Sequence, residues 1–76
     1  MSLDARIASD PEIIGGKPRV KGTRLAVEFI LELLAAGVSE EYLLENYPGL
    51  THEDISACLL YASRIANAAK AFPISA

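Results

Sequence analysis

The sequence predicts a mainly α-helical fold, in which a short N-terminal β-hairpin precedes a three-helix, helix-turn-helix bundle of the homeodomain-like or winged-helix-like kind. Three observations predict it: a glycine- and proline-rich stretch without helical periodicity, an apolar stretch that ends at a glycine, and two later stretches that each begin with a helix-capping residue. We expect a single domain over residues 1–76. The predicted elements are a hairpin at about 13–25 and helices at about 27–36, 39–47 and 52–71.

The hairpin is predicted from residues 13–24, which are rich in glycine, proline and basic side chains. Two short strands near Arg19–Val20 and Arg24–Leu25 fit this stretch best. Gly22 lies between them and can adopt the positive φ that a tight turn requires. Because an isolated two-stranded hairpin is marginal in water, we expect it to pack on helices or to pair with another chain.

The first predicted helix is apolar on nearly every side and ends at Gly37. Glu28 and Glu32, four residues apart, form its evident polar stripe. A helix of this kind is buried on most sides, and in so small a domain a second molecule must cover part of it. The sequence therefore predicts a homodimer or a protein partner, with four interface candidates on this helix: Phe29, Ile30, Leu33 and Leu34.

The second and third predicted helices begin with recognisable caps. Ser39 is a good N-cap for the second helix, and Thr51 caps the third, with Asp54 as the acid of a capping box. One face of the third helix has apolar residues at helical spacing, which we expect to face the core: Ile55, Cys58, Leu59, Ala62, Ile65, Ala66 and Ala69. Because this helix is longer than the domain needs, we expect its alanine-rich C-terminal half to project or to cross a partner.

Composition excludes several classes of function. The chain has 76 residues, a formal net charge of -3, one cysteine and one histidine. No cysteine and histidine spacing suits a metal, and no pair of groups suits acid–base chemistry, so we expect no metal, no cofactor and no enzymatic activity. No apolar run approaches the roughly 18 residues of a membrane span, so we expect a cytoplasmic protein without membrane contact.

Charges are unevenly distributed along the chain. Residues 25–63 contain seven acidic residues and no lysine or arginine, whereas the predicted hairpin contains a cluster of four cations. We interpret these cations as candidate phosphate contacts on DNA: Lys17, Arg19, Lys21 and Arg24. The alternative is a solvated, charged edge strand that discourages aggregation. Arg24 could instead pair with Glu28 or another acidic residue, in which case Lys17 and Lys21 are the better phosphate candidates.

The second and third helices, joined by a short turn that contains Gly49, form the pattern of a helix-turn-helix. The start of the third helix is then the position that reads DNA, with Thr51 and His52 as candidate contacts. Glu53 and Asp54 in the same turn oppose this role, because acidic side chains repel phosphates. A three-helix bundle without any DNA role shows the same pattern.

Several blocks of the sequence resemble a known family. The blocks are Ile13-Ile14-Gly15-Gly16-Lys17-Pro18-Arg19-Val20-Lys21-Gly22-Thr23-Arg24, then Ile30-Leu31 and Leu34-Ala35-Ala36-Gly37, then Tyr47-Pro48-Gly49-Leu50-Thr51-His52-Glu53-Asp54-Ile55. Over roughly residues 7–62 the chain resembles the family catalogued as domain of unknown function 433. This resemblance implies a small bacterial or archaeal helix-turn-helix protein. Relatives are treated as antitoxins of the VapB-like kind, often encoded beside a nuclease-like toxin with a PIN-type fold.

Two hypotheses about function follow. In the first, the chain is an antitoxin-like, DNA-binding dimer of a toxin–antitoxin pair, which binds its operator, a PIN-like toxin, or both. In the second, it is a dimeric interaction module that masks a partner protein and does not touch nucleic acid. In the second hypothesis, the acidic middle of the chain would face a basic partner.

Overall fold

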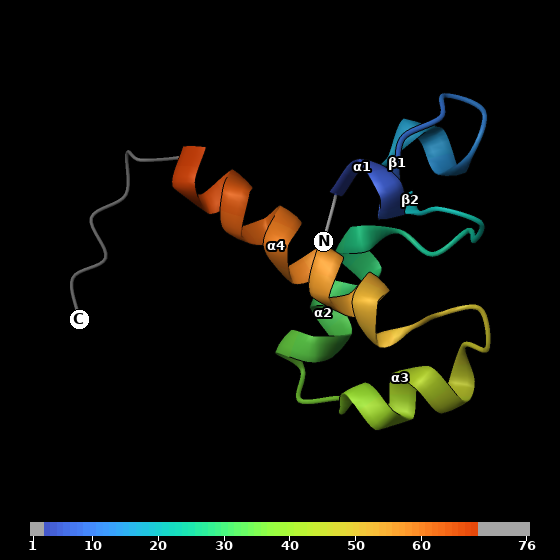
Figure 1. The fold of residues 1–76 in the computed structure, drawn as a ribbon, viewed down its shortest axis with the longest axis vertical. Coiled ribbons are helices and arrows are strands. Elements are labelled where there is room, and N and C mark those ends of the chain that lie inside the picture. The colour runs from blue at the N-terminus through green and yellow to red at the C-terminus, as the bar shows by residue number, and fades with distance from the viewer. Residues whose placement is uncertain (1–2, 69–76) are drawn as a thin grey trace.

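Three main helices and a two-stranded hairpin make up residues 3–68, the part of the chain that the computed structural model describes (Figure 1). In chain order the elements are α1 (Leu3–Arg6), β1 (Ile7–Ala8), the 3-10 helix η1 (Ile14–Gly16), β2 (Arg19–Val20), α2 (Val27–Ala35), α3 (Glu40–Asn46) and α4 (His52–Ala68). This architecture confirms the predicted fold class. The predicted end of the last helix, near residue 71, lies outside the described residues.

The hairpin is formed by β1 and β2, which pair antiparallel with Ile7 opposite Val20. The predicted pairing of Arg19–Val20 with Arg24–Leu25 is present in part, because the Val20 N–H donates to the Leu25 carbonyl at 3.0 Å and Arg19 forms an isolated bridge with Ala26. The sequence did not predict β1 as the sheet partner of β2. A strand of two residues is too short to show an alternating pattern, so the sequence could not predict β1. Its extended conformation depends on packing against the rest of the fold.

The predicted turn after β2 is confirmed. The Thr23 N–H donates to the Val20 carbonyl oxygen at 3.1 Å, and Gly22 has a φ of +80°. The hydroxyl of Thr23 also donates to the Val20 carbonyl, at 2.8 Å, and accepts from the Leu25 N–H at 3.0 Å. These bonds hold the turn in one shape, because they satisfy the backbone groups that a loose loop would leave to water.

Helix α2 ends in a Schellman motif, as the glycine at position 37 predicted. The Val38 N–H donates to the Leu33 carbonyl and the Gly37 N–H to the Leu34 carbonyl, both at 3.0 Å. Gly37 has a φ of +91°, which a residue with a side chain adopts only with strain. The chain therefore reverses sharply between α2 and α3.

The helix starts of α3 and α4 also follow the sequence. The Ser39 hydroxyl accepts from the Tyr42 N–H at 3.1 Å. At α4, Thr51 Oγ1 accepts from the Asp54 N–H at 3.2 Å, and Asp54 Oδ2 accepts from the Thr51 N–H at 3.0 Å. This reciprocal pair is the predicted capping box.

The core lies where α2, α3 and the first half of α4 meet beneath β2. Its buried apolar members are Val20, Val27, Ile30, Leu43, Leu50, Ile55, Ala57 and Cys58. Asp54 is also buried, and its Oδ1 accepts from Nη1 of Arg6 at 3.1 Å. That bond ties the segment before β1 to the start of α4, and it completes the hydrogen bonding of the buried carboxylate.

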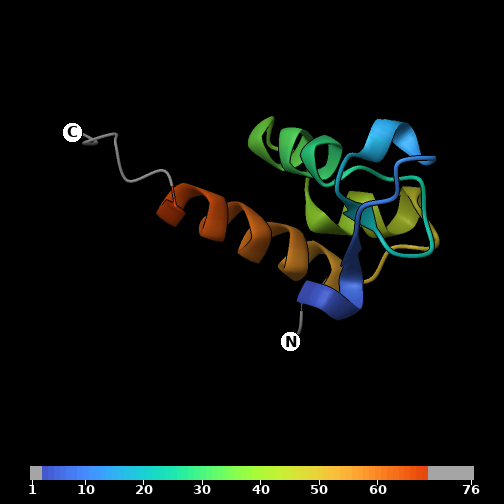
Figure 2. The ribbon, with the colours of Figure 1, turned by 90° about the horizontal axis from the view of Figure 1, so that it is seen from above.

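The second half of α4 leaves the core and projects from the body of the domain, as Figures 1 and 2 show. The predicted core face of this helix is therefore wrong at Leu59 and Ile65, whose exposed fractions are 51% and 52%, and at Ala66, which is also exposed. Ala69, the last predicted member of that face, lies outside the described residues. The apolar spacing continues past Cys58, but no core residue remains for it to meet. Among residues 3–68, no helix is long and apolar enough to cross a membrane.

Candidate functional site

Of the four cations in the predicted basic cluster, Lys17 is drawn toward α2. Its Nζ lies 2.5 Å from Oε1 of Glu28, and this hydrogen bond, followed by the charge of Glu28, raises the pKa of Lys17. Lys17, and not Arg24, is thus the partner of Glu28. Because both side chains are more than half exposed, this surface ion pair adds little to stability, but it neutralises a proposed phosphate contact.

Arg19 is directed inward rather than toward solvent. Its Nη1 donates to the Thr23 carbonyl at 3.4 Å, and its Nε is buried without a hydrogen-bond partner among the described residues. This side chain supports the turn that follows β2. It is therefore a poor candidate for a phosphate contact.

Lys21 and Arg24 are both exposed on the turn that Gly22 forms, and we call residues 21–24 the basic turn. The basic turn lies at the same end of the molecule as the connection between α3 and α4, in both Figure 1 and Figure 2. A Cβ placed on Gly49 of that connection would lie 3.7 Å from Cγ2 of Thr23. The fold therefore brings two exposed cations beside the turn of the predicted helix-turn-helix, although they lie more than twenty residues before it.

The start of α4 is less suited to contact DNA than the sequence predicts, because both candidate residues there bond within the chain. The Thr51 hydroxyl is engaged in the capping box. His52 is exposed, but its Nδ1 lies 2.7 Å from Oε2 of Glu40, at the start of α3. That hydrogen bond, followed by the charge of Glu40, raises the pKa of His52. The neighbouring Glu53 remains exposed.

The four interface candidates on α2 fall into different environments. Ile30 is only 1% exposed and belongs to the chain's own core, so its prediction as an interface residue is wrong. Leu33 and Leu34 are half-buried against that core. Phe29 is 38% exposed and meets the ring of Tyr47 edge-on, with centroids 5.9 Å apart.

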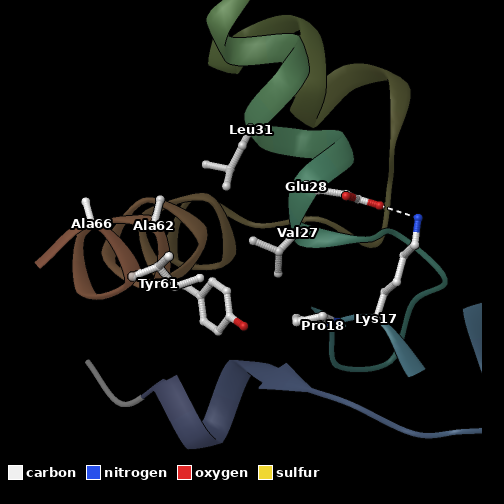
Figure 3. Close-up of a pocket in the computed structure, with 9 residues that line it drawn as sticks. Lys17, Pro18, Val27, Glu28, Leu31, Tyr61, Ala62 and Ala66 are labelled. Atoms are coloured by element: carbon white, nitrogen blue, oxygen red, sulfur yellow. Dashed lines mark hydrogen bonds and ion pairs between the residues drawn. The ribbon is translucent and has the colours of Figure 1, made fainter. Parts of the chain in front are cut away.

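A feature that the sequence did not reveal is an apolar groove between α2 and the projecting half of α4 (Figure 3). Its volume is about 440 Å³. The residues that line it are Lys17, Pro18, Val27, Glu28, Leu31, Tyr61, Ala62, Ile65 and Ala66. In Figure 3, Leu31 and Val27 reach from α2 toward α4, and the Tyr61 ring is directed toward Pro18. The alanines of α4 were a partial signal, because they predicted a projecting helix, but nothing in the sequence placed α2 opposite them.

A second, smaller hollow of about 370 Å³ lies between the end of α2 and α3 and includes Tyr42 and Tyr47.

Within residues 3–68, no three side chains of the metal-binding kinds come together. Cys58 is buried, and this burial raises the pKa of its thiol to about 11. The thiol is therefore kept protonated as part of the core.

These observations describe a small three-helix domain with an N-terminal hairpin, and the comparisons with known proteins identify it more closely. The chain belongs to the family described as "Protein of unknown function (DUF433)", whose model matches residues 7–62. It is similar to the uncharacterized protein y4eO of Sinorhizobium fredii, with 43% identity over 56 residues, which make up 74% of this chain and 25% of that protein.

The crystal structure of a DUF433 member protein from Anabaena variabilis has the same fold. It superposes with a TM-score of 0.76 at 37% identity, over 82% of this chain and 61% of that one. The chain thus spans about a quarter of the length of the curated relative and about three-fifths of the solved one.

Proposed function

We propose that this chain is the antitoxin-like component of a toxin–antitoxin pair in the cytoplasm, and that it binds operator DNA as a dimer through a helix-turn-helix formed by α3 and α4. The observation that carries the proposal is that the basic turn lies close to the connection between α3 and α4, since a Cβ placed on Gly49 would lie 3.7 Å from Cγ2 of Thr23. In helix-turn-helix proteins the second helix enters the major groove while neighbouring segments grip the phosphates. Here the basic turn supplies the cations that α4 lacks near its start.

The basic turn and α4 would have different roles on DNA, because only the basic turn is positively charged. Lys21 and Arg24 would contact phosphates and so set affinity, whereas the polar side of α4 beyond His52 would face the bases. Ser56 and Ser63 belong to that side, because they lie on the face of the helix opposite Cys58. Phosphate contacts position a protein on DNA without regard to sequence, and contacts to the bases specify the site.

Gel-shift titration on the DNA upstream of the gene tests this proposal. Lys21→Gln and Arg24→Gln should each weaken binding on every DNA sequence and reduce the salt dependence by about one released counterion. Ser9→Glu, on an exposed loop residue, changes the net charge equally and serves as the control. Lys17→Gln should weaken binding less than Arg24→Gln, because Glu28 already neutralises Lys17. If no sequence-selective shift occurs at about 50 mM salt, with or without the toxin, the DNA-binding proposal is wrong.

A second candidate function is supported by the apolar groove and by the acidic residues of α2 and α3. In this alternative the chain is a protein-binding module that masks a partner without touching DNA. Co-expression with the product of the neighbouring gene should then yield a complex that survives both Lys21→Gln and Arg24→Gln. Separate elution of the two chains at micromolar concentration would contradict this alternative.

A further inference from the structure

The apolar groove has two walls that come from one chain but do not close on each other (Figure 3). Val27 and Leu31 form the α2 wall, and Ala62, Ile65 and Ala66 form the α4 wall. Ala62 and Ala66 are four residues apart on one side of the helix, so their small side chains leave an open track along α4. The volume of about 440 Å³ lies within the range of pockets that hold a ligand, so the groove has room for inserted side chains.

The sequence that follows α4 carries the kind of side chains that such a groove accepts. Residues 69–76, which lie outside the described residues, include two large apolar side chains, Phe72 and Ile74, and no acidic residue. Pro73 disfavours helical geometry at the residue before it, so the sequence predicts an extended backbone from Phe72 onward. In an extended backbone, residues two positions apart point to the same side. Phe72 and Ile74 are therefore expected on one side of this segment and Ser75 on the other.

The length of this segment allows it to fill the groove of its own chain. Tyr61 is the first residue of α4 in the groove, and Ala68 is the last residue of α4 that the structure describes. These two residues are about 10 Å apart along the helix axis, at about 1.5 Å per residue. Eight extended residues can span about 26 Å, so residues 69–76 can reverse direction after α4 and still reach Tyr61. The short tether also gives the segment a millimolar effective concentration at the groove, which favours it over a second copy at micromolar concentration.

We propose that residues 69–76 turn back along α4 and dock in the apolar groove of the same chain, with Phe72 and Ile74 inserted between α2 and α4. The docked side chains cover apolar surface of Leu31 and Ile65 that otherwise faces water. Ordering the segment costs chain entropy that offsets most of the gain from burial, so docking adds little to the stability of the whole domain. The inference goes beyond the proposed function, because it needs neither DNA nor a dimer. A partner protein that binds in the groove would first have to displace this segment.

Tryptophan fluorescence of the full chain tests the proposal, because the chain contains no tryptophan of its own. Phe72→Trp provides a single reporter, whose emission should lie at shorter wavelength in the native protein than in the protein unfolded in urea. Ala66→Glu in this background places a charge in the groove and should remove most of that shift, since a docked apolar segment would have to bury the charge. Asn67→Glu, on the opposite side of α4, should leave the shift unchanged. Circular dichroism checks that every variant keeps its helices.

A second pair of variants tests the docking segment itself. In the Phe72→Trp background, Ile74→Glu should also remove most of the shift, whereas Ser75→Glu should retain it, because only the first of these side chains faces the groove. The shift should be the same at about 1 and about 100 micromolar protein, since a tethered segment docks within its own chain. An unshifted native emission would overturn the proposal. So would equal effects within either pair of variants, or a shift that appears only at the higher concentration, which would assign the groove to a second copy.

Discussion

The two halves of α4 belong to one continuous helix, but they are held in place in different ways. Residues 52–58 have a capping box, a bonded buried carboxylate and a complete apolar core around them. Residues 59–68 share the apolar groove with α2 and Pro18, and they keep large apolar side chains half exposed. The comparison shows that the first half of α4 is held by the core, and that the second half leaves apolar side chains exposed.

The two halves of α4 should differ most when an isoleucine is truncated to alanine in each of them and the loss of stability is measured. Ile55→Ala should lower the free energy of unfolding by about 2–5 kcal/mol, because it opens a cavity in the core. Ile65→Ala should lower it by no more than about 0.5 kcal/mol in dilute protein, since that side chain is half exposed. Urea denaturation followed by circular dichroism measures both. Equal losses would mean that the two halves do not differ.

The same contrast can be measured as thiol reactivity. Burial raises the pKa of Cys58 to about 11, so the native protein should react with a disulfide reagent at pH 8 more than about a hundredfold more slowly than an exposed thiol. Leu59→Cys, combined with Cys58→Ala, provides that exposed thiol one residue further along the helix. Unfolding in urea should make the two proteins react at similar rates. Fast labelling of native Cys58 would show that the first half of α4 opens readily.

The capping box tests why the first half of α4 is well held. Asp54→Ala removes the bonds to the Thr51 N–H and to Arg6, and should lower the free energy of unfolding by about 1–2 kcal/mol. Glu53→Ala, at the exposed neighbour, should change it by about 0.5 kcal/mol or less. A double-mutant cycle of Asp54→Ala with Arg6→Ala would separate the part of the loss that belongs to the ion pair.

The pair of Glu40 on α3 and His52 on α4 should contribute least to stability. Its contribution is visible only as a change of stability with pH. Because Glu40 favours the protonated imidazole, the pKa of His52 in the folded protein lies above its ordinary value of 6.5. The pair therefore stabilises the fold fully below pH 6.5, while Glu40 is ionised, and this contribution disappears as the pH rises through the folded-state pKa.

Melting temperatures of the wild type and of Glu40→Gln measure this effect. They should differ more at about pH 5.5 than at about pH 8. Glu41→Gln, on the adjacent residue of α3, should show no such change with pH. A difference between wild type and Glu40→Gln that is constant with pH would mean that the pair with His52 does not form in solution.

Local sequence rules predicted much of this structure. The helix caps act through hydrogen bonds to residues at most a few positions away, so they can be predicted from spacing alone. These caps are Ser39, Thr51 with Asp54, and Gly37. The fold class follows from these helix boundaries. The positive φ of Gly22 was predictable for the same reason.

The candidate site was less predictable, because it depends on contacts between residues far apart in the sequence. Lys17 and Arg24 look equivalent in the sequence, and only the path of the chain over α2 brings Lys17 to Glu28. The close approach of Thr23 to Gly49 brings together residues that are 26 positions apart. The apolar spacing at Leu59 and Ile65 resembles a core face, since a helical pattern does not show where the rest of the domain ends.

Because both halves of α4 belong to one continuous helix, the buried half fixes the direction in which the side chains of the second half point. Each residue of α4 turns the helix by about 100°, so one residue inserted after Cys58 would rotate Tyr61, Ala62 and Ile65 by more than a quarter of a circle away from α2. An insertion of seven residues, about two full turns, would restore their direction and lengthen the helix by about 10 Å. The orientation of the apolar groove is therefore set by the phase of one uninterrupted helix, and changes of length within it are compatible with the groove only in steps of whole turns.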